Sequence, residues 1–201
     1  MKGIRSAAIA ASIAAALAFG QVAQAKSPVP GKPGKSNIVE IAAAVNGDSG
    51  EFSYLLGAVG CLTDDEGNNP IVNLLSGSDK YTLFAPTDEA FKALQRALKV
   101  PAGSESPEIT CTLGDAVVAD VLAYHVTDGR RFSNSVFNRK NTKMLEMLNG
   151  QYVVTNPGAK LNDVAGQTVG VVLKPGLFNI NASNGVIHVI DKVLLPFPVP
   201  N

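Results

Sequence analysis

Residues 184–196 read NGVIHVIDKVLLP and carry the clearest β-strand signal in the chain. Asn184-Gly185 is a strong turn dipeptide, and Pro196 ends the stretch. Between them the residues are apolar and mostly β-branched, apart from His188 and the pair Asp191-Lys192. A run of this composition, bounded by a turn and a proline, predicts a pair of buried strands late in the chain.

Two earlier blocks have equally distinct patterns. Residues 81–91, YTLFAPTDEAF, predict a strand followed by a helix that Thr87 caps and that carries two acidic residues in its first turn. Residues 121–126, VLAYHV, lie between this block and the late strands and contain the pair Tyr124-His125.

These three blocks resemble the fasciclin (FAS1) domain family in their order, their residues and their spacing. The resemblance covers residues 37–196. The resemblance implies a β-wedge of two mainly antiparallel sheets with helices packed along it. It also implies a non-enzymatic, extracytoplasmic adhesion or interaction module. In animal members the pair that matches Tyr124-His125 is linked to integrin recognition.

The order of the remaining patterns predicts an α+β fold independently of that resemblance, because expected helices fill the first half and expected strands the second. Helices are expected over residues 37–45, 51–59, 70–75, 87–98 and 115–124, with a loop over 100–110. Strands are expected over residues 144–148, 152–155, 169–173, 178–180 and 186–195.

The first 25 residues have the composition of a secretory signal peptide. Lys2 and Arg5 precede an uncharged apolar stretch, and Ala23-Gln24-Ala25 supplies a cleavage site after Ala25. The alternative is an uncleaved membrane anchor. Cleavage predicts a secreted or periplasmic protein.

The rest of the chain divides into three parts. Residues 26–36 form a Pro/Gly/Lys-rich flexible linker, residues 37–196 the FAS1 domain, and residues 197–201 a tail too short to hold the protein in a membrane. From residue 37 onward the chain carries 17 acidic and 12 basic residues. This mildly acidic balance disfavours nucleic acid as a partner.

The only two cysteines, Cys61 and Cys111, are expected to form a disulfide bond after export. Such a bond stabilises the fold by about 4 kcal/mol on a chain-entropy basis. Two free buried thiols are the alternative.

No stretch carries a convincing catalytic, metal or cofactor motif. Gly47-Asp48-Ser49-Gly50 resembles the surroundings of a serine-protease nucleophile, but both histidines follow it, and a turn between helices is expected instead. His125 and His188 are expected in the core, with a ligand or pH-switch role as the alternative. The acidic stretch 64–69 lacks the spacing of a calcium loop. We therefore predict no enzymatic activity, no metal and no cofactor.

Two groups of residues are candidates for partner contact. The first is a basic stretch without acidic residues, which steers a protein toward anionic polymers or membrane headgroups unless it is an ordinary solvated loop. It comprises Arg130, Arg131, Arg139, Lys140 and Lys143. The second is Tyr124-His125, for which burial as a packing joint is favoured over direct contact.

Two functions remain from the sequence. The first is an adhesion or interaction module that binds a cell-surface or matrix protein or polysaccharide, with peripheral contact to anionic surfaces and a homodimer left open. The second is a soluble carrier of a small apolar ligand or lipid.

Overall fold

The computed structural model describes residues 34–137 and 140–198. The predicted signal peptide, the linker up to residue 33, Arg139 and the last three residues of the tail lie outside these ranges.

Helices occupy the first half of the domain, as predicted. They are α1 (Ile38–Ser49), α2 (Ser53–Gly60), α3 (Pro70–Ser76), α4 (Asp88–Ala97) and α5 (Asp115–Ala123). The sequence did not predict the 3-10 helix η1 (Pro107–Leu113), which starts in the expected loop, or the single turn α6 (Ser133–Val136). The four residues of α6 are too few to show an apolar stripe of helical period, and η1 begins at a proline in a stretch whose prolines and glycine favour a loop.

The first helix is longer than predicted. Its N-terminus is closed by a capping box between Asn37 and Glu40. The predicted end at residue 45 is wrong, because the helix ends only where Gly50 adopts the left-handed conformation with φ 69°. The Ser49 hydroxyl donates to the Val45 carbonyl, so the serine of the GDSG tetrapeptide belongs to a helix end and not to a turn.

The strands form two four-stranded sheets. The first sheet has the order β2 (Val126–Asp128), β1 (Tyr81–Pro86), β8 (Gly185–Ile190), β7 (Ile180–Ala182). The second has the order β3 (Lys143–Glu146), β4 (Tyr152–Asn156), β5 (Lys160–Asn162), β6 (Thr168–Gly170). All neighbours are antiparallel except β1 and β8, which run parallel. The predicted α+β class with two mainly antiparallel sheets is confirmed.

Residues 184–196 form one strand and not the predicted pair. The strand β8 ends at Ile190, because Asp191 turns to accept the Gly170 N–H at 2.7 Å. In the residues that follow, backbone N–H groups donate hydrogen bonds to side chains and not to another strand. The Leu194 N–H donates to His125, and the Leu195 N–H donates to Asp163. An apolar run that is buried without a sheet partner has the same sequence pattern as a strand.

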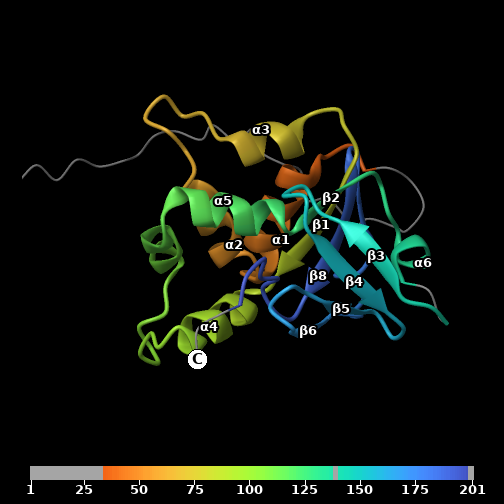
Figure 1. The fold of residues 1–201 in the computed structure, drawn as a ribbon. Helices are drawn as coiled ribbons and strands as arrows, with labels where there is room; N and C mark the ends of the chain where they lie inside the picture. Colours follow the sequence, from red (N-terminus) through yellow and green to blue (C-terminus); the bar gives the residue numbers. More distant parts are fainter. Residues whose placement is uncertain (1–33, 138–139, 199–201) are drawn as a thin grey trace, which may run out of the picture.

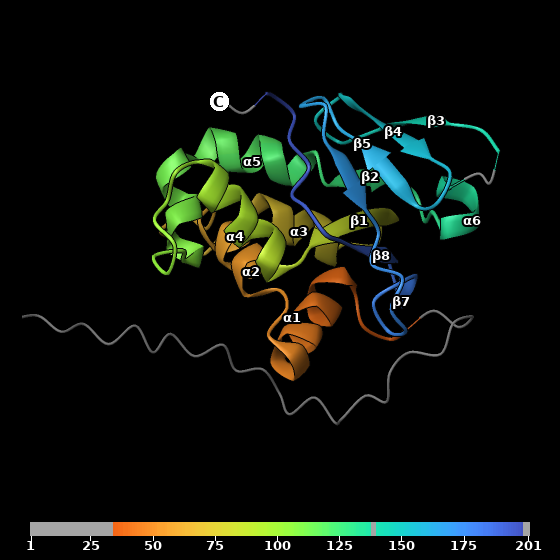
Figure 2. The ribbon, with the colours of Figure 1, turned by 90° about the horizontal axis from the view of Figure 1, so that it is seen from below.

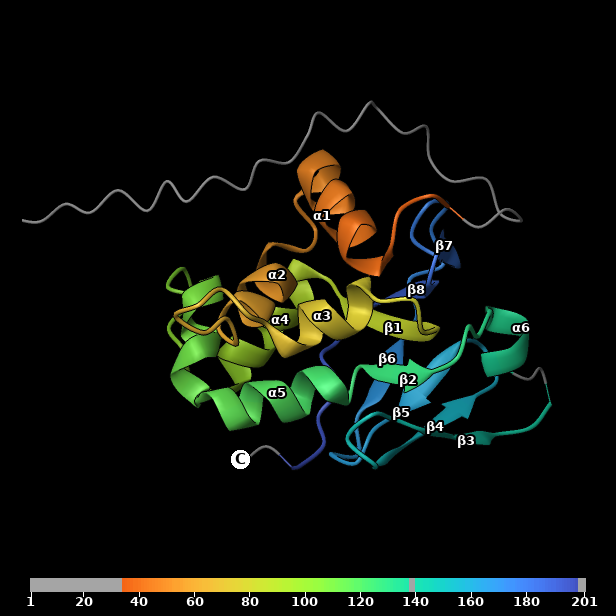
Figure 3. The same cartoon turned by 90° about the horizontal axis from the view of Figure 1, so that it is seen from above.

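The first sheet separates two hydrophobic cores. Figures 1 and 3 show α2 to α5 gathered on one side of β1 and β8, and the second sheet on the other. Side chains alternate along the two central strands. Leu83, Ala85, Ile187 and Val189 pack in the helical core, whereas Phe84 and Ile190 pack in the core between the sheets. Burial on both faces explains why these strands are continuously apolar.

Gly185, the first residue of β8, is predicted to tolerate no side chain. A Cβ there would overlap the Tyr81 carbonyl oxygen and lie 2.6 Å from Ile38 Cδ1. We expect Gly185→Ala to lower the free energy of unfolding by about 3 kcal/mol, measured by urea denaturation. Gly47→Ala is the matched control, because it lies within α1 with nothing within 4 Å and should be neutral or stabilising. Equal stability of the two variants would contradict this prediction.

Candidate functional site

Tyr124 and His125 follow the end of α5 and are buried, with 0% and 1% of their surface exposed. The Tyr124 hydroxyl donates to the Tyr152 carbonyl at 2.9 Å and accepts the Val164 N–H at 3.1 Å. The Tyr124 hydroxyl therefore connects the end of α5 to β4 and to the segment that follows β5. The pair is placed as a packing joint and offers no surface for a partner in this conformation.

His125 has a hydrogen bond on each ring nitrogen. Its Nδ1–H donates to the Val121 carbonyl at 2.7 Å, and its Nε2 accepts the Leu194 N–H at 2.9 Å. Only the neutral imidazole can donate from one nitrogen and accept at the other. Burial lowers the pKa of His125 to about 4, while the bond to Val121 opposes that shift.

This pKa predicts loss of stability in mild acid. In the unfolded chain His125 titrates near 6.5, so below that pH protons bind the unfolded state first and favour it. From this residue we expect the free energy of unfolding to fall by about 1.4 kcal/mol for each pH unit from 6.5 down to about 4. Urea denaturation at pH 7, 6 and 5 measures the slope. It should be shallower in His125→Gln, and an unchanged slope would contradict the assignment.

His188, in the middle of β8, lies among three phenylalanine rings. The ring centroids of Phe84, Phe178 and Phe137 lie 5.6, 5.7 and 6.2 Å from that of the imidazole. Its Nε2–H donates to the Arg131 carbonyl at 2.9 Å, and its Nδ1 is buried without a hydrogen-bond partner. Burial lowers the pKa of His188 and outweighs the opposing bond to Arg131. It is a core residue, as expected, but one whose hydrogen bonding is incomplete.

The basic stretch is divided by the fold. Arg130 is a structural residue, because its guanidinium donates to Asn181 Oδ1 and to the carbonyls of Ala182 and Ser183 at 2.6 to 3.1 Å. The exposed Arg131 donates from Nε to the Asp128 carbonyl. Lys140 and Lys143 are exposed, and Lys143 Nζ donates to the Ser135 carbonyl. The sequence pattern alone could not separate the structural arginine from the exposed basic residues.

The exposed lysines border an edge strand. β3 is the outer strand of the second sheet and pairs only with β4 within it. Met144 on this strand is 69% exposed, the highest value among the exposed large hydrophobic residues of the described chain. We call Lys140, Lys143 and Met144 the basic edge.

A second feature, which sequence analysis missed, is an apolar cavity of about 110 Å³ among the helices. Its walls come from α2, α4, η1, α5 and the segment after β8, including Ala58, Phe91, Ile109, Val121 and Leu195. Figure 2 shows that segment leaving β8 and passing toward α4 and α5. We call this space the helical cavity.

Apolar residues in stretches predicted to be irregular could have indicated this cavity. Ile109 falls in the expected loop and Leu113 just after it, and Phe197 falls in the expected tail, yet all three line the cavity. A solvated loop or tail has no need of large apolar side chains.

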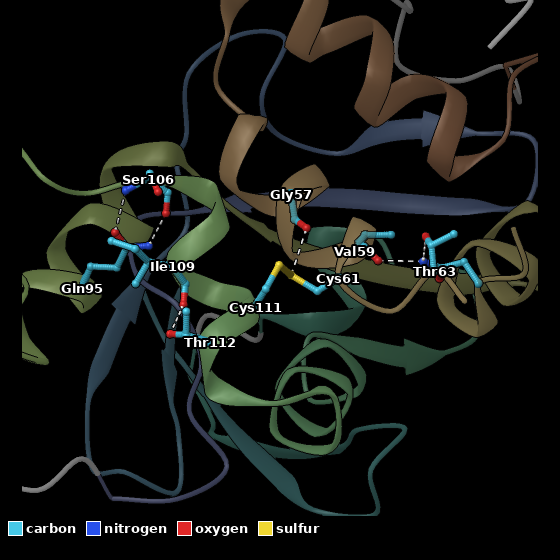
Figure 4. The surroundings of a disulfide bond; sticks show 10 residues. Gly57, Val59, Cys61, Thr63, Gln95, Ser106, Ile109, Cys111 and Thr112 are labelled. Carbon is cyan, nitrogen blue, oxygen red and sulfur yellow. Dashed lines mark hydrogen bonds between the residues drawn. A yellow bond between two sulfur atoms is a disulfide. The ribbon is translucent and has the colours of Figure 1, made fainter. Parts of the chain in front are cut away.

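The disulfide bond holds one wall of the helical cavity in place. Figure 4 shows Cys61, at the end of α2, bonded to Cys111 of η1. No residue of η1 is fully buried, so this helix depends on its links to neighbours. Besides the disulfide, the Gln95 side chain bonds to the backbone N–H and carbonyl of Ser106, and Arg96 forms an ion pair with Glu105.

Within residues 34–137 and 140–198, no cluster of three or more His, Cys, Asp or Glu side chains is arranged to hold a metal ion. In the acidic stretch, the Asp64 carboxylate accepts the backbone N–H groups of Glu66 and Asn68, and Asn69 caps α3. These oxygens thus shape the loop. None of the helices described has the length and apolar character needed to cross a bilayer.

Comparisons with known proteins find matches over most of the domain. The sequence profile described as "Fasciclin domain" matches residues 63–196. A relative from Synechocystis, "Protein sll1483", is 30% identical over 169 residues, which cover 79% of this chain and 73% of that protein. Human periostin is 32% identical over 127 residues, covering 63% of this chain and 13% of periostin.

Two further proteins are similar over most of the domain. "Immunogenic protein MPB70" of Mycobacterium bovis is 28% identical over 130 residues, covering 64% of this chain and 57% of that protein. A solved FAS1 domain pair from the insect cell adhesion molecule Fasciclin I aligns with a TM-score of 0.37 and 15% identity, over 78% of this chain and 44% of that one. On the profile match and the Synechocystis relative, the chain belongs to the fasciclin domain family.

Proposed function

We propose that this protein is a non-enzymatic interaction module that attaches, outside the cytoplasm, to a cell-surface or matrix protein or to an anionic polysaccharide. The observation that carries the proposal is the basic edge, where two exposed lysines border an exposed methionine on an outer strand. Membership of the fasciclin domain family supports this function, because adhesion is the role expected of that domain.

The basic edge combines two modes of recognition. An outer strand can pair through its backbone with an added strand of a partner, and on β3 this concerns the end at Met144, because at the other end the Glu146 carbonyl already accepts the Thr127 hydroxyl. Lys140 and Lys143 supply positive charge beside it, on a domain that is otherwise mildly acidic. This charge attracts carboxylates or sulfates of a partner and raises its rate of association.

The proposed cellular arrangement follows from the sequence. A signal peptide is cleaved after Ala25, and residues 26–36 then act as a spacer before the domain of residues 37–196. A disulfide bond between Cys61 and Cys111 is compatible with the oxidising conditions outside the cytoplasm. N-terminal sequencing of the exported protein tests the cleavage site, and a start at Lys26 is expected.

The adhesion proposal is tested by capture from envelope and extracellular extract on immobilised protein. We compare Lys140→Gln/Lys143→Gln with Lys160→Gln/Lys174→Gln, which removes the same charge from exposed lysines elsewhere. Arg130 is left unchanged, because its loss would disturb the β7–β8 turn. Partner capture should be lost only in the first variant. Equal capture by both variants would rule out the basic edge as the contact surface.

A second candidate function is a carrier of a small apolar ligand, and the helical cavity is the observation that favours it. A carrier retains its ligand through purification. Extraction of the purified protein with organic solvent, followed by mass spectrometry, should then release one dominant apolar compound. An extract without such a compound argues against this function.

A further inference from the structure

Among the described residues that line the helical cavity, none has a charged side chain. The polar side chains there are Gln95, Thr110 and His125. The Gln95 amide donates to the Ser106 carbonyl and accepts its N–H, and both ring nitrogens of His125 have backbone partners. The hydrogen-bonding atoms at the cavity wall are therefore used largely within the protein itself.

This lining selects the chemistry of an occupant. A peptide in extended conformation brings backbone N–H and carbonyl groups that need partners, and burying them without partners is costly. A charged group would lose its hydration without gaining an ion pair. A hydrocarbon chain has no hydrogen bonds with water and no charge to lose. Its transfer from water to an apolar surface is favourable.

Three of the residues that line the cavity also expose apolar side chains to solvent, and we call them its rim. Leu98, Leu113 and Phe197 line the cavity and are 39%, 42% and 39% exposed. They come from the end of α4, from η1 and from the C-terminal segment, so three separate parts of the chain bring exposed apolar surface to one place. A ligand seated in the cavity would cover this rim.

We propose that the helical cavity is a binding site for an uncharged hydrocarbon group, such as the acyl chain of a small amphiphile. The chain enters between Leu98 and Leu113 and packs against Phe91 and Val121, and a polar headgroup, where present, stays in solvent. This inference rests on the second candidate function and specifies its site and ligand class.

The test is a fluorescence titration of the purified protein with N-phenyl-1-naphthylamine, an uncharged apolar probe, and its displacement by 1-dodecanol. The rim variant is Leu98→Gln/Leu113→Gln. The matched control is Leu148→Gln/Leu173→Gln, two exposed leucines that do not line the cavity. Urea denaturation confirms that both variants are folded before the probe is added.

We expect saturable binding to the unaltered protein, about tenfold weaker binding to the rim variant, and binding within about twofold in the control. Absence of saturable binding to the unaltered protein would overturn the site, as would equal affinities of the two variants. Displacement of the probe by an apolar helical peptide but not by dodecanol would also overturn it, in favour of a protein partner.

The two experiments separate this site from the carrier function. If probe binding depends on the rim and the solvent extract contains no apolar compound, the site is supported and the carrier function is contradicted. An apolar compound in the extract, with probe binding unaffected by the rim substitutions, supports a carrier whose ligand lies elsewhere.

Discussion

Replacing Asn184 with alanine is expected to lower the free energy of unfolding by about 4 kcal/mol, because three backbone groups, two of them buried, would lose their partner. Asn184 Oδ1 accepts the Ile38 N–H at 2.9 Å, and its Nδ2 donates to the carbonyls of Leu75 and Gly77 at 2.6 and 3.1 Å. One side chain at the start of β8 thus holds the beginning of α1 and the end of α3. Chemical denaturation with urea measures the loss.

Asn162→Ala is the control for this prediction. Asn162 is an exposed asparagine on β5, and its side chain accepts one hydrogen bond, from Thr168. Its replacement should change the free energy of unfolding by less than about 0.5 kcal/mol. If Asn184→Ala lowers the free energy of unfolding no more than Asn162→Ala does, Asn184 does not connect the helices to the sheet as its contacts indicate.

Removing the disulfide bond is expected to have an effect of similar size. Cys61 and Cys111 are 50 residues apart in the chain, and opening a loop of this length costs about 4 kcal/mol through the entropy of the unfolded state. We expect Cys61→Ser/Cys111→Ser to be destabilised by that amount in urea denaturation.

The unaltered protein in reducing buffer serves as the control, because it loses the same bond without any substitution. Its unfolding midpoint should fall to near that of the double-serine variant. A loss of less than about 1 kcal/mol in both would show that η1 is fixed by its other links, the Gln95–Ser106 pair and the Arg96–Glu105 ion pair.

Arg130 illustrates why the candidate contact surface could not be read fully from the sequence. Next to Arg131 it looks like one more surface charge, yet its guanidinium bonds to residues more than fifty positions away. Which of two adjacent arginines is structural depends on where β7 and β8 pass. Nothing within the basic stretch itself contains that information.

The sequence by itself determined the features that depend on near neighbours along the chain. The helix start at Thr87 follows from a side chain that caps a backbone group three positions ahead. The strands β1 and β8 follow from continuous apolar composition, and the presence of only two cysteines limits the chain to one possible disulfide bond.

Tertiary structure alone decided what depends on residues distant in the chain. The parallel pairing of β1 with β8 joins strands about a hundred residues apart, and the end of β8 at Ile190 is set by Asp191 bonding to Gly170. The helical cavity exists because segments distant in the chain leave a space that none of them encloses alone. Local pattern fixes which side chains are apolar, but only packing fixes which of them remain uncovered.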